Sequence, residues 1–203
     1  MWGVVEDNET YKIFVDFRPG ASHISFRDNV IHYDAGLAID VETQFTDVPR
    51  LTQDLRFDHN TFISSGAGAN FLQINGPGKD ISVTNNLMIA PNIKWVGGGA
   101  GALIIAGTDL SSFSEISNNI WPAAPASAKQ PGDNYLYPTL NVGTRGYVPN
   151  SQWAQYSQVQ GEQYDNADLS DGQYSLTLNG VTAGALPSVF NTNDYTVAVK
   201  AAA

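Results

Sequence analysis

The chain has 203 residues, 42% of them hydrophobic, which is enough to bury the core of one domain or of one long solenoid segment. Twenty acidic residues against ten basic ones give a formal net charge of −10, which disfavours nonspecific binding to nucleic acid or to an anionic membrane surface. The absence of cysteine excludes disulfide bonds and thiolate chemistry.

Both ends of the sequence suggest a piece of a longer protein. The segment Met1–Glu6 lacks the basic and apolar regions of a signal peptide, so no such peptide is expected in this chain. No apolar run approaches the roughly 18 to 20 residues that cross a bilayer, so we expect no membrane insertion. The final residues 201–203, all alanine, resemble a remainder of cloning.

Strands are predicted first at Val4-Val5 and Tyr11–Asp16, which we expect to form an early, irregular turn of the fold. An alternating strand, a corner that ends in Asn and a second short apolar strand then recur four times. The copies are Ile24–Ile31, Leu55–Phe62, Ile81–Met88 and Ser114–Trp121. The intervals between their asparagines are 31, 26 and 33 residues, which indicates one structural repeat with loops of variable length.

Within each copy, apolar residues two apart share one face of the first strand. They are Ile24 and Phe26, Leu55 and Phe57, and Ile81 and Val83, whereas the fourth copy has Ser114 where an apolar residue is expected. The corners are Asp28-Asn29, His59-Asn60, Asn85-Asn86 and Asn118-Asn119. Asn tolerates the left-handed backbone of such a corner, and stacked Asn amides are expected to form a ladder at the strand spacing of about 4.8 Å.

A further strand follows each of the first three copies, at residues 36–42, 70–75 and 101–106. Three short strands per turn predict an all-β, right-handed parallel β-helix over residues 1–121. Residues 122–200 are expected to form a C-terminal tail that caps the last coil, because an open solenoid end exposes strand edges. An antiparallel sandwich stays open as the alternative, although the four copies themselves contain no Asn-Gly or Asp-Gly turn of tight hairpins.

From about His23 to Trp121 the repeat resembles the parallel β-helix repeats of the pectin-lyase-like superfamily. That superfamily includes polysaccharide lyases, glycoside hydrolases, epimerases, phage tailspikes and adhesins. The resemblance implies a secreted or surface protein of bacterial or phage origin that is a lyase or hydrolase acting on an extended, uronate-containing glycan. The alternative is a noncatalytic solenoid segment that binds glycan or is purely structural. Open strand edges also allow end-to-end self-association.

Two outward patches are candidate sites. Asp40 and Glu42 lie two apart on one strand, about 7 Å by strand rise, which suits a Ca²⁺ site or the carboxyl pair of an inverting glycosidase. Stacking is expected to place Gln73 and Asn75 beside Ala38 and Asp40. Surface charge without function is the simpler interpretation of this pair.

The second patch contains Arg27, Arg56, Asp58 and His59, with an ion pair expected between Arg27 and Asp58. Lyases of the resembled superfamily abstract a proton with Arg or Lys while Ca²⁺ neutralises the uronate. The resemblance therefore implies Arg56, Lys79 or Arg27 as the base and Asp34, Asp40 and Glu42 as metal ligands, although no catalytic motif of the family matches closely. Arg27, His59, Gln73 and Asn75 are also candidate substrate-binding residues. So are Lys94 and Trp95, which are expected to form a sugar-stacking platform.

Overall fold

The computed structural model describes residues 3–42, 51–66, 68–92, 101–106, 110–122, 135–136, 148–149, 157–165 and 173–186. These residues form three parallel sheets and two small antiparallel pairs, and their helical structure is limited to the 3-10 turn η1 (Leu110–Ser112). The all-β class is confirmed. Parallel pairing between the repeats contradicts the antiparallel sandwich.

Each parallel sheet is built from strands of successive repeats, which lie side by side. Sheet A contains, in spatial order, β1 (Gly3–Glu6), β4 (Ser22–Arg27), β7 (Thr52–Asp58), β10 (Gly78–Thr84), β13 (Phe113–Ser117) and β17 (Val159–Gln160). Sheet B contains β2 (Glu9–Tyr11), β5 (Val30–His32), β8 (Thr61–Ile63), β11 (Leu87–Ile89), β14 (Ile120–Trp121) and β18 (Gln163–Tyr164). Sheet C contains β3 (Val15–Phe17), β6 (Ala35–Glu42), β9 (Gly68–Asn75) and β12 (Gly101–Ala106).

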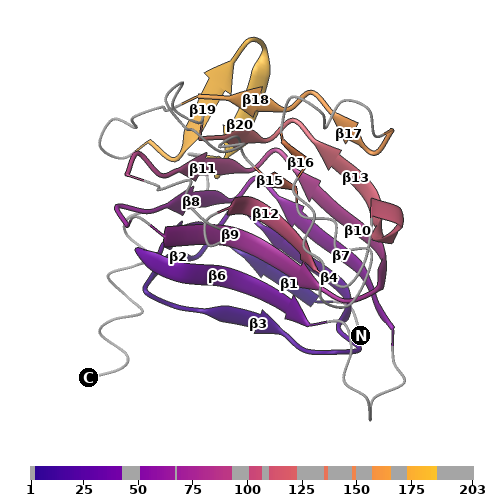
Figure 1. Cartoon of the computed structure of the whole chain (residues 1–203). Coiled ribbons are helices and arrows are strands. Elements are labelled where there is room, and N and C mark those ends of the chain that lie inside the picture. The colour runs from indigo at the N-terminus through magenta and orange to yellow at the C-terminus, as the bar shows by residue number, and fades with distance from the viewer. Residues whose placement is uncertain are drawn as a thin grey trace, which may run out of the picture.

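The chain therefore visits sheets A, B and C in turn in the first four repeats, and the last two described repeats contribute strands to sheets A and B only. Figure 1 shows the repeats stacked from β1–β3, in indigo, up to β17 and β18, in orange. The expected early turn is confirmed as β1, β2 and β3, but the strand predicted over Tyr11–Asp16 is wrong, because residues 12–14 are not strand and separate β2 from β3. The parallel sheets also continue past residue 121, because β17 and β18 pair with β13 and β14.

Apolar side chains from all three sheets meet in one core. The expected register is confirmed in sheet A, where Ile24 pairs with Leu55, and Leu55 with Ile81. Leu55 and Ile81 are fully buried, and burying an aliphatic side chain of this size contributes about 1.5–3 kcal/mol. Phe71 of sheet C packs 5.6 Å from Phe62 and 6.2 Å from Trp121, between ring centroids.

In the fourth copy, a β-bulge in β13 places an apolar side chain at the inward position of the strand. Ile81 pairs with Phe113 and Ser82 with Glu115, so Ser114 is the extra residue and remains exposed. Phe113, only 4% exposed, takes the inward place that the sequence alignment had assigned to Ser114.

The corners adopt left-handed backbone at the first residue of each pair, not at the ladder asparagine. The φ values are 53° at Asp28, 51° at His59, and 55° at Asn85 and Asn118. Asp7 (φ 60°) and Gly161 (φ 65°) occupy the equivalent place in the first and last repeats. Two further corners thus exist that the sequence pattern did not reveal.

The second residue of each corner forms the predicted ladder. Its members are Asn8, Asn29, Asn60, Asn86, Asn119 and Glu162. Each Asn Nδ2 donates to the side-chain oxygen of the next member at 2.9–3.0 Å. From Asn29 to Asn119, Nδ2 also donates to a backbone carbonyl of the preceding repeat, for example from Asn60 to Phe26 at 2.9 Å. One amide therefore holds three repeats together.

A hairpin of β19 (Ser175–Leu178) and β20 (Val181–Gly184) covers the outer face of sheet B. Its turn is Asn179-Gly180, both with positive φ, which is the geometry of a two-residue hairpin loop. Its apolar side chains Leu176, Leu178, Val181 and Ala183 pack on Leu87, Ile89 and Ile120. In Figure 1 the hairpin, in yellow, rises past β18. This part of the tail thus covers a side of the stack rather than only its end.

The second antiparallel pair consists of β15 (Tyr135–Leu136) and β16 (Val148–Pro149). No helix in the described ranges has the length and hydropathy that a bilayer span requires.

Candidate functional site

An open groove of about 420 Å³ lies on the outer face of sheet A. Two columns of outward side chains line the groove. The two columns come from strand positions that lie two residues apart. The first column is Ser25, Arg56, Ser82 and Glu115, and the second is Arg27, Asp58, Thr84 and Ser117. Asn85 and Asn118 border the groove at the corner.

The alternation that buries the core also builds this groove. Leu55 and Phe57 face inward, so Arg56 and Asp58 face outward from the same strand. Parallel register then repeats these positions every strand spacing, about 4.8 Å. The result is a regular array of hydroxyl, amide and charged groups along the stack.

Asp58 is fixed as a carboxylate in the middle of the groove. Its Oδ1 accepts hydrogen bonds from Thr84 Oγ1 at 2.7 Å and Asn85 Nδ2 at 2.8 Å, and its Oδ2 lies 3.0 Å from His59 Nδ1. Burial raises the pKa of Asp58, but the hydrogen bonds from His59, Asn85 and Thr84 outweigh burial and lower it. The bond to Asp58 raises the pKa of His59. Asp58 therefore organises its neighbours and is poorly suited to donate a proton.

Both arginines of the groove are engaged by carboxylates at its margin. Arg27 Nε donates to Glu6 at 2.6 Å, and Arg56 Nε lies 3.2 Å from Asp54 Oδ1. The predicted Arg27–Asp58 ion pair is wrong, although the two residues do pair in register. Glu6 holds Arg27 from the preceding strand, while Asp58 already has three other partners.

The hydrogen bond to Glu6 raises the pKa of Arg27, which makes it a weaker candidate for a base. At the far end of the groove, Ser117 Oγ donates to Glu115 at 2.5 Å. The groove thus offers polar contacts over several strands, and its two carboxylates, Asp58 and Glu115, lie two strands apart.

The Asp40 patch forms on sheet C with a different register from the one expected. Gln73 pairs with Asp40 and Asn75 with Glu42, rather than with Ala38 and Asp40. Ala38 is fully buried, because it belongs to the core cluster that contains Phe71. The strand therefore does not keep a strict inward and outward alternation there.

A cation that the sequence reasoning overlooked, Arg18, joins this patch. It contacts Glu42 at 2.7 Å and Asp16 at 2.6 Å. Burial raises the pKa of Asp40, and the neighbouring carboxylates of Glu42 and Asp16 raise it further; Gln73 Nε2 donates to Asp40 at 3.4 Å and opposes this. The raised pKa of Asp40 beside an arginine-paired Glu42 resembles the electrostatics of an acid and base pair.

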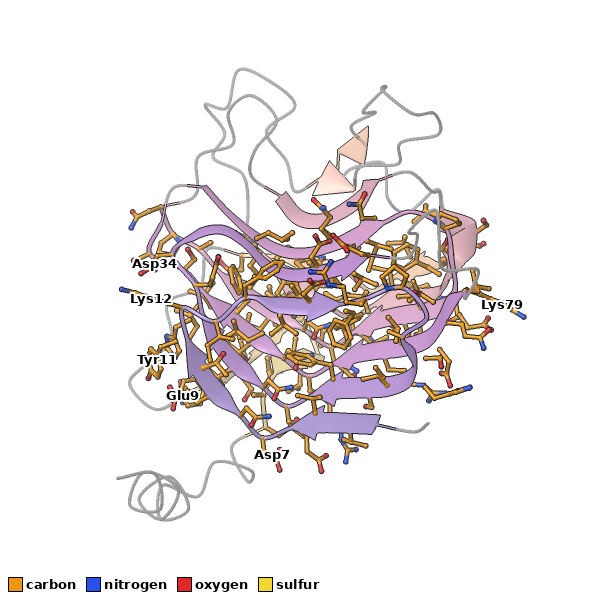
Figure 2. All side chains as sticks on the ribbon, turned by 90° about the horizontal axis from the view of Figure 1, so that it is seen from below. Asp7, Glu9, Tyr11, Lys12, Asp34 and Lys79 are labelled. Carbon is orange, nitrogen blue, oxygen red and sulfur yellow. The ribbon has the colours of Figure 1, made fainter. Side chains whose placement is uncertain are left out.

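The remaining predicted residues do not converge on either patch. Lys79 lies at the start of β10, 3.9 Å from Asp80, and Asp34 accepts hydrogen bonds from the Ser65 backbone and hydroxyl at 2.9 and 2.8 Å. Figure 2 shows Asp34 and Lys79 on opposite sides of the molecule. Lys94 and Trp95 lie outside the described residues.

No group of three or more His, Asp or Glu side chains that could hold a metal occurs among the described residues. Calcium binding at Asp34, Asp40 and Glu42 therefore stays a prediction.

A polar cluster that the sequence did not suggest lies on the outer face of sheet B. Glu9 Oε1 accepts from Tyr11 Oη at 2.7 Å and Tyr174 Oη at 3.0 Å, and His32 Nε2 lies 3.0 Å from it. The Tyr11 and His32 rings stack with centroids 4.3 Å apart. Burial raises the pKa of Glu9, but the three hydrogen bonds lower it overall. The alternation Glu9-Thr10-Tyr11 was the only local signal, because Tyr174 is 165 residues away.

Comparison with known proteins finds no matching family model, no matching curated protein and no matching solved structure.

Proposed function

We propose that the chain is a right-handed parallel β-helix of the pectin-lyase-like type that binds an extended glycan along the outer groove of sheet A. The rotation of the chain through sheets A, B and C, with an internal amide ladder, supports this fold. The observation that supports the function is the groove itself, in which equivalent polar side chains recur on successive strands. A polymer lying across the strands can meet a polar side chain at each strand spacing.

The charges of the groove favour an uncharged glycan over the uronate polymer expected from the sequence. Arg27 and Arg56 are balanced within the groove by Asp58 and Glu115, and each arginine is also paired with a carboxylate at its margin. An acidic sugar would have to displace these partners. The net charge of −10 opposes its approach as well.

The groove supports binding better than hydrolysis. Asp58 and Glu115 lie two strand spacings apart, roughly 10 Å, and are also offset by two residues along the strands, so their positions are farther apart than the carboxyl separations of about 5–9.5 Å in glycosidases. The low pKa of Asp58 also removes it as the acid.

A calorimetric or NMR titration with neutral and uronate oligosaccharides tests this proposal. We expect neutral oligomers to bind and Arg56→Ala to weaken them about tenfold, the effect of losing roughly 1.4 kcal/mol of contacts. Lys79→Ala is the matched control, because Lys79 lies on the neighbouring strand β10 but outside the groove.

Absence of binding by any glycan would reject the proposal. Equal losses in the Arg56→Ala and Lys79→Ala variants would also reject it, because the groove would then not be the site.

A second candidate function, hydrolysis at the Asp40 patch, is favoured by the raised pKa of Asp40. Asp40 would protonate the leaving oxygen, and Glu42, two residues along the strand at about 7 Å, would activate water. Release of reducing ends should then fall at least 100-fold in Asp40→Asn and Glu42→Gln. Asp34→Asn serves as the control, and activity that survives both changes excludes this pair.

A further inference from the structure

Among the described residues, no further strand pairs with the outer edges of the first repeat. Strands β1, β2 and β3 are the terminal members of sheets A, B and C within the described residues. Figure 2 views the molecule from this end. Val4, Val5, Ile13 and Phe14 are 57%, 39%, 50% and 46% exposed, whereas Phe26 and Phe57, the equivalents of Val5 in the next two repeats, are buried. Unpaired strand edges beside exposed apolar side chains favour the addition of further strands.

At this end of the amide ladder, Asn8 lacks, among the described residues, the hydrogen bonds that the later asparagines form with a preceding repeat. Asn29 and each later ladder Asn bind a carbonyl of the repeat before them, as Asn29 Nδ2 binds Val5 at 3.0 Å. Asn29 also donates from its backbone N and from Nδ2 to Oδ1 of Asn60. Asn8 donates to Asn29 and to its own strand at Glu6, but its Oδ1 accepts from no described residue.

We propose that this end is an interaction surface for another polypeptide that adds one more strand, Asn corner and strand in parallel to β1 and β2. The partner's strand carbonyl would accept from Asn8 Nδ2, and the partner's Asn would donate its backbone N–H and Nδ2 to Asn8 Oδ1. Its apolar residues would cover Val5 and the end of the core. Every bond in this interface already occurs between the repeats of the chain, so the surface continues an established interface.

The ladder disfavours a second copy of the chain in this place. The opposite end of the ladder is Glu162, whose carboxylate has no amide hydrogen to donate to Asn8 Oδ1. The surface therefore fits a partner with an amide at the corner better than it fits self-association.

Titration of the protein with a labelled peptide of the sequence 22–34 tests the proposal. This peptide carries β4, the Asp28-Asn29 corner and β5, the layer that pairs with β1 and β2 within the chain. We expect it to bind and to protect the backbone amides of β1 and β2 from hydrogen exchange. The same peptide with Asn29→Asp keeps its shape and loses the Nδ2 donor, so it should bind at least tenfold more weakly.

An Asn8→Ala variant of the protein should remove the difference between the two peptides, and Thr177→Ala, on the remote hairpin, should preserve it. The proposal is overturned if neither peptide binds, if both bind equally to the unaltered protein, or if protection appears at β17 and β18 instead. A mass that rises with concentration in sedimentation would also overturn it, because a second copy would then be the occupant.

Discussion

Single polar side chains at the corners carry the network that joins the repeats. Asn60 is fully buried, donates to Phe26 and Asn86, and accepts from the backbone and side chain of Asn29. The low polarity of the surroundings makes each of these bonds costly to leave unmade. We therefore expect the corner to tolerate variation at its first residue, which is at least partly exposed, and little at its buried second residue.

Replacement of Asn60 by Ala should lower the free energy of unfolding by about 3–5 kcal/mol, because Phe26 C=O and two Asn29 N–H groups lose their partner. Urea denaturation measures the change. Asn92→Ala, which loses one exposed bond to Ser65, is the control and should cost less than about 1 kcal/mol. Similar losses for the two variants would show that the ladder adds no special stability.

Glu162 gives the ladder a pH dependence. Its carboxylate accepts from Asn119 and from the Trp121 indole. Burial nevertheless raises its pKa from 4.5 to about 8. The protonated carboxyl group of Glu162 therefore makes its full contribution to the free energy of unfolding below about pH 4.5. This contribution is lost as the pH rises through about 8.

We expect Glu162→Gln to gain stability relative to the unaltered protein between pH 4.5 and about 8. The gain should be at most roughly 1.4 kcal/mol per pH unit. Urea unfolding of both proteins at several pH values gives the difference. A difference that does not change with pH contradicts the assignment.

Among the strands and turns, the hairpin β19–β20 depends on one close approach. At Gly184 (φ 96°) an added Cβ would meet backbone atoms of Tyr174 and Ser175, and Thr61 Oγ1 at 2.7 Å. Thr61 Oγ1 also accepts from Ala185 N at 2.8 Å and donates to the Tyr174 carbonyl. The hairpin thus needs glycine where it meets β8.

Gly184→Ala should loosen the hairpin from sheet B and raise hydrogen exchange in β19 and β20. Gly180→Ala is the matched control, since Gly180 also has positive φ but nothing within 4 Å of an added Cβ. It should cost only the backbone strain, about 1–2 kcal/mol. If the control loosens the hairpin equally, the contact with β8 is not what holds it.

The sequence predicts those strands whose apolar residues form a local pattern. Strands 36–42, 70–75 and 101–106 were anticipated to within two residues of their bounds. The corner Asp7-Asn8 could not be recognised from sequence because Val4, Val5 and Glu9 do not follow the alternation of the other copies. The corner Gly161-Glu162 could not be recognised because it contains no Asn. The bulge at Ser114 hid the role of Phe113.

The candidate sites were harder to anticipate than the strands. Register alone brought Arg27, Arg56 and Asp58 together, as predicted. Which partner each charge chooses depends on neighbours in three dimensions: Arg27 binds Glu6, and Arg18 joins Glu42 from 24 residues away. Contacts such as Tyr174 to Glu9 have no local sequence signal.

For the molecule as a whole, stability should be graded along the stack. Central strands such as β7 and β10 have a neighbour on both sides, while β1 has one neighbour and exposed Val4. We expect backbone amides of β7, β8 and β10 to exchange slowest and those of β1–β3 fastest. Hydrogen exchange followed by mass spectrometry measures this gradient. Equal protection in all repeats would contradict it.

The ladder bonds are nearly identical although the residues they join are 21, 31, 26, 33 and 43 positions apart in the chain. The register is thus set by the corners and not by the length of the connections. Since the entropy of closing a longer loop grows slowly, insertions between repeats should be tolerated. New sequences can therefore be acquired or grafted there, one connection at a time, without redesign of the scaffold.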